Sequence, residues 1–166
     1  MKRRSALALI GQTSAAGLVL AGCGFKLRGN QSYAFQSLAV MPNPGGALAI
    51  ELRRTIGSSV HVLAPGEPLT QAQVVLEILK EQHEKAVVGV NSSGQVREFQ
   101  LRIRVKFRIR TPHGNELVAE SEILQQRDIS FNESAVLAKE AEEAMLYRNM
   151  QSDIVQQLLR RLAAVK

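Results

Sequence analysis

The chain has 166 residues, of which 45% are hydrophobic and 22% charged, a balance typical of one globular domain and not of a disordered chain. Aromatic residues make up only 4%, which argues against an aromatic platform for single-stranded nucleic acid. The single cysteine excludes an intramolecular disulfide, and with only three histidines a metal site built from Cys or His is not expected. Half of the formal charge of +6 comes from Lys2, Arg3 and Arg4, so the rest of the chain is too weakly basic to indicate a nucleic-acid partner.

The first 22 residues are typical of a bacterial secretory signal. A cationic start precedes the apolar stretch Ser5–Leu20, which is too short and too interrupted for a transmembrane helix. The sequence Leu20–Cys23 resembles the lipobox of bacterial lipoproteins, in which the signal is cleaved before the cysteine and the thiol is acylated; a chance match is the alternative. Gly24 favours the outer membrane, because Asp in its place resembles an inner-membrane retention signal. We therefore expect a signal peptide over 1–22, acyl chains such as palmitate on Cys23, and an anchor and linker over 23–36.

Short elements follow the predicted anchor. Leu38–Met41 is an apolar run that predicts a buried strand, and Val60–Leu63 is a candidate for a second one. Between them, apolar residues at helical spacing predict a helix over 48–56, with Arg53 and Arg54 facing outward.

The remaining predicted elements are longer. Val74–Val88 predicts a strand that leaves the core partway, through a bulge, because charged residues interrupt its apolar pattern. Residues 99–110 alternate strictly between apolar and polar side chains, which predicts a strand with one buried face. Leu117–Asp128 predicts the return strand of a hairpin. A helical pattern then runs from 132 or 134 to 165, and Ser130 with Glu133 is a candidate capping box at its start.

This order of elements predicts a single α+β domain over residues 37–166. We expect a two-layer sandwich, with two helices packed on one face of a roughly four-stranded, mostly antiparallel sheet. The other face is left uncovered and carries a row of cations about 6.6 Å apart, twice the rise of a strand. We call this row the basic ladder; it consists of Arg102, Arg104, Lys106, Arg108 and Arg110.

Two interpretations of the basic ladder stay open. It is either a docking surface for anions or for the polar wall of a partner, or a solvated face whose charges form ion pairs. In one possible register of the hairpin, the numbers of directly opposed residues add up to 228. Arg108 then lies opposite Glu120, and Lys106 lies opposite Glu122. The pattern alone favours neither reading. Five cations exceed two acids, however, and the periplasmic face of an outer membrane handles phosphorylated glycolipid, so the predicted anchor favours docking.

The sequence contains no catalytic motif that we could identify. It lacks a GxSxG elbow, a phosphate-binding loop and a dinucleotide fingerprint. Glu140, Glu142 and Glu143 are spaced like a solvated helix face, which is a commoner arrangement than an acid–base pair. We therefore expect a non-enzymatic protein without a metal or a cofactor.

The segment Gly22–Gly29, with the sequence GCGFKLRG, resembles the N-terminus of the LptE family of lipopolysaccharide-assembly lipoproteins. The turn Gly94-Gln95 before a long alternating strand is also similar to the family. So are Phe131-Asn132 and the closing helix that follows them. The resemblance covers essentially the whole chain after the predicted signal.

The resemblance implies a fold like the predicted sandwich and a specific task. Members of the family plug the lumen of the outer-membrane barrel LptD in a one-to-one complex and help it insert lipopolysaccharide into the outer leaflet. They also bind lipopolysaccharide through basic residues near the turn before the long strand and near the start of the last helix. Lys139 matches the second position. At the first position, near the turn, the chain has Asn91–Ser93 in place of a basic residue, and Arg97 is the nearest substitute. The other interpretation of Lys139 is a solvated helix cation beside Glu142 and Glu143.

A protein of a different class is the alternative to the plug. It is a free-standing periplasmic lipoprotein that binds peptidoglycan or another envelope protein. Loss of a plug should deplete its correctly assembled barrel, whereas loss of a free-standing binder should not.

Overall fold

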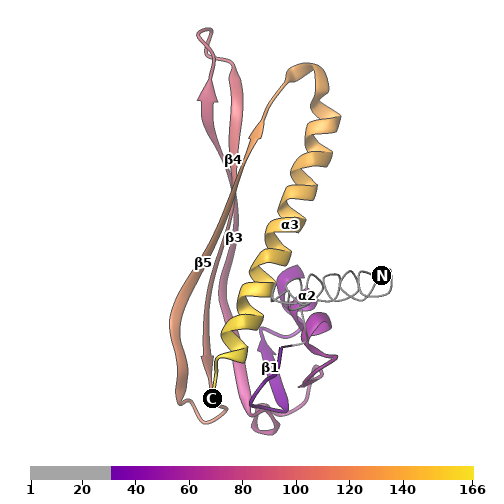
Figure 1. Ribbon diagram of the computed structural model, residues 1–166, viewed down its shortest axis with the longest axis vertical. Helices are drawn as coiled ribbons and strands as arrows, with labels where there is room; N and C mark the ends of the chain where they lie inside the picture. The colour runs from indigo at the N-terminus through magenta and orange to yellow at the C-terminus, as the bar shows by residue number, and fades with distance from the viewer. Residues whose placement is uncertain (1–30) are drawn as a thin grey trace, which may run out of the picture. The chain divides into compact units, whose positions relative to one another are not determined.

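The computed structural model describes residues 31–166, so the predicted signal peptide, Cys23 and the motif around it lie outside the described residues. In the described part, two helices pack on one face of a five-stranded sheet with the strand order β2-β1-β3-β4-β5 (Figure 1). The strand β1 runs parallel to β2 and β3, whereas β3, β4 and β5 are successively antiparallel. This arrangement confirms the predicted α+β class. Within residues 31–166, no helix has both the length and the apolar character needed to cross a membrane.

The sheet has one strand more than the four that the sequence predicts. The candidate strand around residues 60–63 does form, but it is confined to two residues that pair with β1. The strands are β1 (Ser37–Met41), β2 (His61–Val62), β3 (Val74–Val90), β4 (Val96–Arg110) and β5 (Glu116–Ser130). The helices are α2 (Ala47–Ile56) and α3 (Val136–Ala163), with short 3-10 helices η2 (Leu69–Gln71) and η3 (Glu133–Ala135).

The main core lies between the sheet and the two helices. Every second residue of β4, from Leu101 to Ile109, is buried against them, as the alternating pattern predicts. The helix α2 buries Leu48, Ala49, Leu52 and Ile56, and α3 buries Met150, Ile154, Val155, Leu158, Leu159 and Leu162. All the buried side chains of α3 belong to its second half, so the core occupies the end of the sheet where β1 lies.

The opposite face of the sheet is covered at one end, which corrects the prediction that it is open throughout. Ala39 and Val75 point to this face and form a second apolar cluster with Leu63 and Ala72. The segment between β2 and β3, which includes η2, supplies these two residues. Strands in parallel pairing are commonly apolar on both faces, and β1 and the start of β3 follow that rule.

The strand β3 confirms the predicted bulge. Its first three residues are buried and the rest are partly or fully exposed. Its pairing with β4 slips between Ile78 and Lys80, so one extra residue stands on the β3 side.

The start of α3 differs from the predicted capping box. Asn132 caps the short 3-10 helix η3 that leads into α3, and its Oδ1 accepts a hydrogen bond of 3.0 Å from the backbone N–H of Ser134, whereas Ala135, the N-cap residue of α3 itself, makes no side-chain cap. Ser130 is instead the last residue of β5, and its hydroxyl accepts a hydrogen bond from Lys139. Both Ser and Asn are good caps, and the length of β5 decides which one is in place.

The prediction that Arg53 faces outward is wrong. Its Nη2 donates hydrogen bonds of 2.8 Å to the carbonyls of Val40 and Pro42, and its Nη1 donates to the carbonyl of Pro44. The segment after β1 contains two prolines, which have no N–H, and Arg53 serves as a donor to the carbonyls around them. Arg54 beside it is exposed, as predicted.

We expect Arg53→Met to lower the free energy of unfolding by about 1 to 3 kcal/mol, because hydrogen bonds from a charged donor contribute on this order. Urea unfolding followed by circular dichroism measures the change. Arg54→Met is the matched control and should stay within about 0.5 kcal/mol of the wild type. Equal losses in the two variants would contradict the role of Arg53.

The register of the β4–β5 hairpin is partly as predicted. Paired residue numbers sum to 228 from Glu98 opposite Ser130 to Phe107 opposite Ser121, which confirms that Lys106 lies opposite Glu122. Beyond Phe107 the register shifts, so the predicted pairing of Arg108 with Glu120 is wrong.

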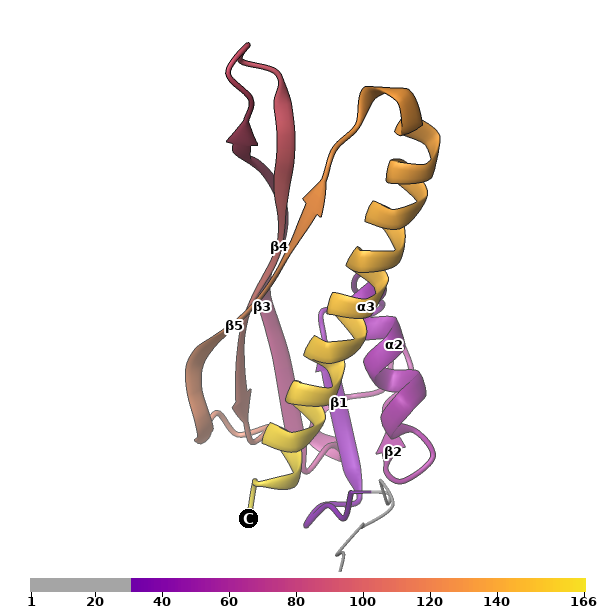
Figure 2. The ribbon, with the colours of Figure 1, turned by 45° about the horizontal axis from the view of Figure 1, so that its top comes forward.

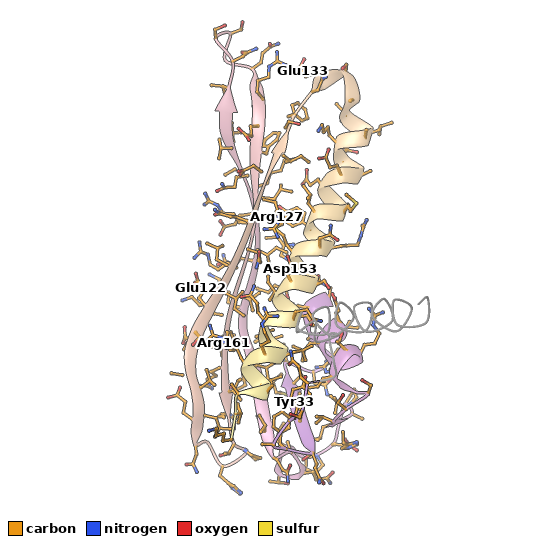
Figure 3. The ribbon with its side chains drawn as sticks, in the orientation of Figure 1. Tyr33, Glu122, Arg127, Glu133, Asp153 and Arg161 are labelled. Carbon is orange, nitrogen blue, oxygen red and sulfur yellow. The ribbon has the colours of Figure 1, made fainter. Side chains whose placement is uncertain are left out.

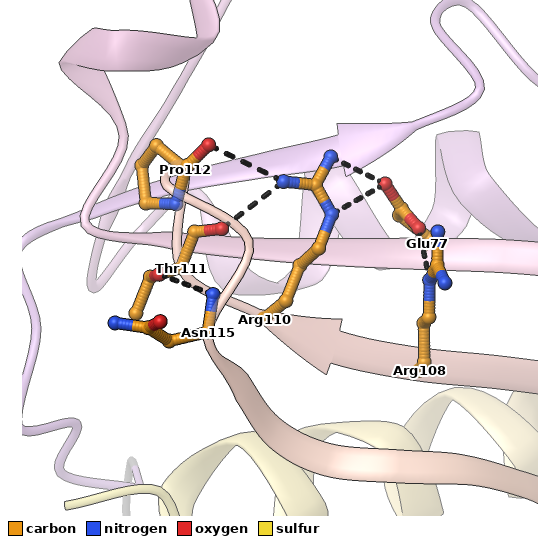
Figure 4. Close-up of polar contacts among 6 residues, drawn as sticks. All are labelled: Glu77, Arg108, Arg110, Thr111, Pro112 and Asn115. Carbon is orange, nitrogen blue, oxygen red and sulfur yellow. Dashed lines mark hydrogen bonds and ion pairs between the residues drawn. The ribbon is translucent and has the colours of Figure 1, made fainter.

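Glu77 of β3 is the residue that Arg108 meets. The Arg108 Nε donates to one carboxylate oxygen of Glu77, and Arg110 contacts the other through Nε at 2.8 Å and Nη2 at 2.6 Å (Figure 4). The side chain of Glu77 is only 14% exposed. Burial by itself would raise the pKa of Glu77, but the hydrogen bonds and charges of Arg110 and Arg108 outweigh it and hold the pKa below its ordinary value of 4.5.

The lowered pKa of Glu77 predicts how stability depends on pH. Glu77 stabilises the fold fully above its unfolded pKa, and this contribution is lost as the pH falls through the lower pKa of the folded state. Glu77→Gln should therefore be less stable than the wild type by about 1 to 3 kcal/mol at pH 7. The gap between the two proteins should shrink as the pH falls below about 4.5 towards 3. Urea unfolding at a series of pH values measures the gap, and a gap that stays constant would count against this pairing.

Candidate functional site

The basic ladder lies on the sheet face away from the helices, as predicted. On β4 the odd-numbered side chains enter the core, so the ladder residues, all even-numbered, point to the opposite face. Their neighbours on the same face come from β3 and β5, which flank β4 on its two sides.

Four of the five ladder cations have an acidic partner, which reduces the excess of cations that the sequence predicts. Arg104 contacts Glu122 at 2.5 Å, and Lys106 contacts Glu120 at 3.6 Å. Arg108 and Arg110 share Glu77, as described above. These partners fit the ion-pair interpretation, although Arg104 and Lys106 pair diagonally and not directly across the hairpin.

Arg102 is the ladder residue for which residues 31–166 supply no carboxylate within ion-pair distance. Its guanidinium donates to the side-chain oxygen of Gln100, at 2.7 Å from Nε. Sequence reasoning missed two of the acids on this face, Glu77 and Glu84, because they come from β3, whose bulge changes the register along the strand. Most of the ladder is therefore ion-paired, but Arg108 and Arg110 share one carboxylate and Arg102 is bound to an amide oxygen.

The structure brings the two predicted lipopolysaccharide-binding residues to the same end of the sheet. The backbone N–H of Phe131 donates to the carbonyl of Arg97 at 2.8 Å, and Lys139 Nζ donates to the Ser130 hydroxyl at 3.0 Å. Their partners are thus consecutive residues where β5 leads into η3. We call this the distal end; it holds the β3–β4 turn over 91–95 and the start of α3 (Figure 2).

Arg97 and Lys139 differ in how they are held. Arg97 is exposed, and its Nη2 lies 3.5 Å from the side-chain oxygen of Gln95. Lys139 is 21% exposed and also forms an ion pair of 2.8 Å with Glu142. Lys139 is thus a helix cation paired with Glu142, but it is largely shielded and not solvated, and its ammonium contacts Ser130 at the distal end.

Lys85 is a cation at the distal end that the sequence analysis did not single out. It lies on the helix-facing side of β3, with Nζ 2.6 Å from a carboxylate oxygen of Glu143 and 4.4 Å from the centre of the Phe99 ring. A hairpin turn over 91–95 pairs Lys85 with Leu101, a core residue, and would have placed Lys85 on the helix-facing side of the sheet. Lys85, Lys139, Phe99 and Glu143 all line one cavity of about 80 Å³.

Polar contacts hold α3 against the distal half of the sheet. The Tyr147 hydroxyl donates to the carbonyl of Glu84 at 2.8 Å, and its ring stacks on His83 with centroids 5.3 Å apart. Burial, together with the charges of Glu143 and Glu84, raises the pKa of Tyr147, so the phenol stays protonated as a donor. Nearer the core, Arg127 of β5 and Asp153 of α3 pair at 3.0 Å (Figure 3). Within residues 31–166, no cluster of three or more Cys, His, Asp or Glu side chains is placed to hold a metal ion.

Comparisons with known proteins agree on one family. The sequence profile of the LptE family, described as lipopolysaccharide-assembly, matches residues 35–162. A protein of Yersinia enterocolitica named LPS-assembly lipoprotein LptE is 30% identical over 99% of this chain and 78% of its own length. A protein of the same name from Photorhabdus laumondii is 29% identical over 89% of this chain and 81% of its own length.

Solved structures have the same fold. An uncharacterized lipoprotein B from Nitrosomonas europaea is 34% identical and superposes with a TM-score of 0.72 over 85% of this chain and 91% of that one. A rare lipoprotein B from Shewanella oneidensis, 20% identical, has a TM-score of 0.63 over 78% of this chain and 95% of that one, and supports the fold alone. The profile match and the relative from Yersinia enterocolitica each cover most of the chain, and they show that it belongs to the LptE family of lipopolysaccharide-assembly lipoproteins.

Proposed function

We propose that this chain is a non-enzymatic lipoprotein of the outer membrane that plugs the LptD barrel and helps it insert lipopolysaccharide into the outer leaflet. The observation that carries the proposal is family membership combined with a sheet that buries one face and presents a polar, ion-paired face on the other. Curated relatives are named for lipopolysaccharide assembly, and the barrel partner is what the family resemblance implies.

The anchor is part of the proposal. Residues 1–22 are the signal peptide, Cys23 is acylated, and residues 23–36 connect the lipid to the domain over 37–166. Several acyl chains on one N-terminus give stable attachment, since each buried methylene contributes about 0.8 kcal/mol. Gly24 after the cysteine directs the protein to the periplasmic face of the outer membrane.

The polar sheet face suits the inside of a barrel. The lumen of a transmembrane barrel is lined with polar side chains, because every second residue of its strands points inward. A plug in such a lumen needs a surface that stays hydrated and exchanges ion pairs with the wall. The basic ladder fits this need, because its partly exposed pairs each contribute no more than about 1 kcal/mol.

Lipopolysaccharide binding is assigned to the distal end. Lys139 stands at the position of the last helix that the family resemblance names, and Arg97 is the substitute near the preceding turn. The phosphates of lipid A are strong acceptors for Lys and Arg, although such contacts are not selective on their own. The backbone of Arg97 and the side chain of Lys139 contact consecutive residues at the same end of the sheet, and we expect one ligand to contact both residues.

The first test is co-purification of the tagged, lipidated protein from detergent-solubilised outer membranes. We expect a single large barrel in one-to-one ratio, identified by mass spectrometry. Arg102→Glu should reduce the amount of recovered barrel, because it reverses the charge of the ladder residue that lacks a carboxylate partner within residues 31–166.

Arg161→Glu is the control for this experiment. It makes the same change of charge on an exposed position of α3 and leaves the sheet face intact. Recovery of no barrel, or only of proteins linked to peptidoglycan, would replace the plug with the free-standing binder. If both variants recover the same reduced amount of barrel, the basic ladder is not part of the surface that contacts the barrel.

The second test concerns the lipid. Lys139→Asp should weaken lipopolysaccharide binding about tenfold or more. The substitution removes a hydrogen-bond donor to the phosphate and introduces a carboxylate, which repels the phosphate. One charge-assisted hydrogen bond contributes about 1.5 to 3 kcal/mol. Binding is measured by calorimetry or by surface plasmon resonance on the full chain in detergent.

Arg148→Asp is the comparison variant, since Arg148 is an exposed cation on the same helix. It should retain wild-type affinity, and both variants should keep the wild-type circular dichroism spectrum. Unchanged affinity in Lys139→Asp would remove Lys139 from the site.

A further inference from the structure

A small cleft opens between the start of α3 and the distal parts of β3, β4 and β5. We call it the distal cleft; its volume is about 80 Å³, and Lys85, Phe99, Phe131, Val136, Lys139 and Glu143 line it. It combines apolar and cationic groups. The rings of Phe99 and Phe131 meet edge to face with centroids 5.4 Å apart, and Val136 is 40% exposed beside them. Such a lining matches an amphiphile with an anionic group and an apolar chain.

Both lysines of the distal cleft are held by carboxylates of the protein itself. Lys139 pairs with Glu142 within α3, one turn away. Lys85 pairs with Glu143 at 2.6 Å, across the cleft from β3 to α3. Glu143 therefore occupies the position from which an external anion would approach Lys85.

The pair between Lys85 and Glu143 is open to exchange. The side chains are 39% and 24% exposed, and ion pairs of this kind contribute only up to about 1 kcal/mol. A phosphate group carries more negative charge than a carboxylate and has more acceptor oxygens. Lys85 is already positioned, because its ammonium lies over the Phe99 ring.

We propose that Lys85 is a further binding residue for a phosphorylated glycolipid in the distal cleft, and that the ligand phosphate displaces Glu143 from it. This inference rests on the proposed binding of lipopolysaccharide at the distal end. Glu143 acts as an internal counter-ion that keeps Lys85 in place when the cleft is empty and lowers affinity by competing for it. The apolar lining receives the start of the lipid chain.

The test measures binding of bisphosphorylated lipid A to the full chain in detergent. Glu143→Gln should bind about two- to fivefold more tightly than the wild type, the gain that corresponds to removing one partly exposed ion pair. Glu140→Gln is the matched control, because Glu140 lines the same cleft and carries the same charge but has no ion-pair partner within residues 31–166. It should change affinity much less.

A second variant ties the gain to Lys85. Lys85→Gln should weaken binding, and adding Glu143→Gln to it should bring no further gain, because the contested cation is gone. Dephosphorylated lipid A should show no gain with Glu143→Gln. Inorganic phosphate should compete only far above the lipid concentration, since it does not contact the apolar lining; competition at equal concentration would overturn the assignment to a lipid.

The outcomes separate this inference from the function on which it rests. If Lys139→Asp weakens binding but Glu143→Gln leaves it unchanged, the exchange at Lys85 is wrong and the distal site stands. If Glu140→Gln tightens binding as much as Glu143→Gln, net charge explains the gain and the exchange is again wrong. If the wild type does not bind lipid A at all, both the site and the exchange fall.

Discussion

The alternation of β4 is the constraint on which the rest of the structure depends. It is the central strand of its hairpins, and every second side chain from Arg102 to Arg110 is cationic. A strand with charges at this spacing cannot be covered by apolar layers on both faces, because each buried and unpaired charge would cost several kcal/mol. The helices are therefore confined to the other face, and the two-layer architecture with a polar outer surface follows.

The packing divides the sandwich into two halves with different chemistry. In the half that contains β1, the second half of α3 buries six apolar side chains against the sheet. In the distal half, residues 136–149 of α3 bury none, and hydrogen bonds and ion pairs from Tyr147 and Lys85 connect the helix to β3 instead. Polar ties of this kind are individually weak, so the distal half is the part in which side chains can change partners without loss of the core.

Sequence patterns with one dominant cause were predicted well, and those decided by tertiary contacts were not. The period of two in residues 99–110 predicted the buried face of β4, and the register sum of 228 holds from Glu98 to Phe107 but not beside the turn, where Arg110 lies opposite Glu116. The partner of Arg108 is Glu77 of β3, so it could not be found from the β4–β5 hairpin alone. Arg53 was assigned to solvent because helical spacing places it outside the apolar stripe. Its actual partners are carbonyls of the preceding loop, which periodicity does not report.

The two charged regions of the domain follow one principle. The ladder pairs its cations with acids from the flanking strands, and the distal cleft pairs its lysines with acids of α3. Carboxylates of the protein itself neutralise these cations and so reduce their attraction for other anions. Ion pairs that remain partly exposed contribute little free energy, so a cation in such a pair can exchange one anion for another. A partner must then supply anions in the right geometry, not merely negative charge. Under the proposed function, selectivity on both surfaces would come from the cations that the protein's own carboxylates already hold.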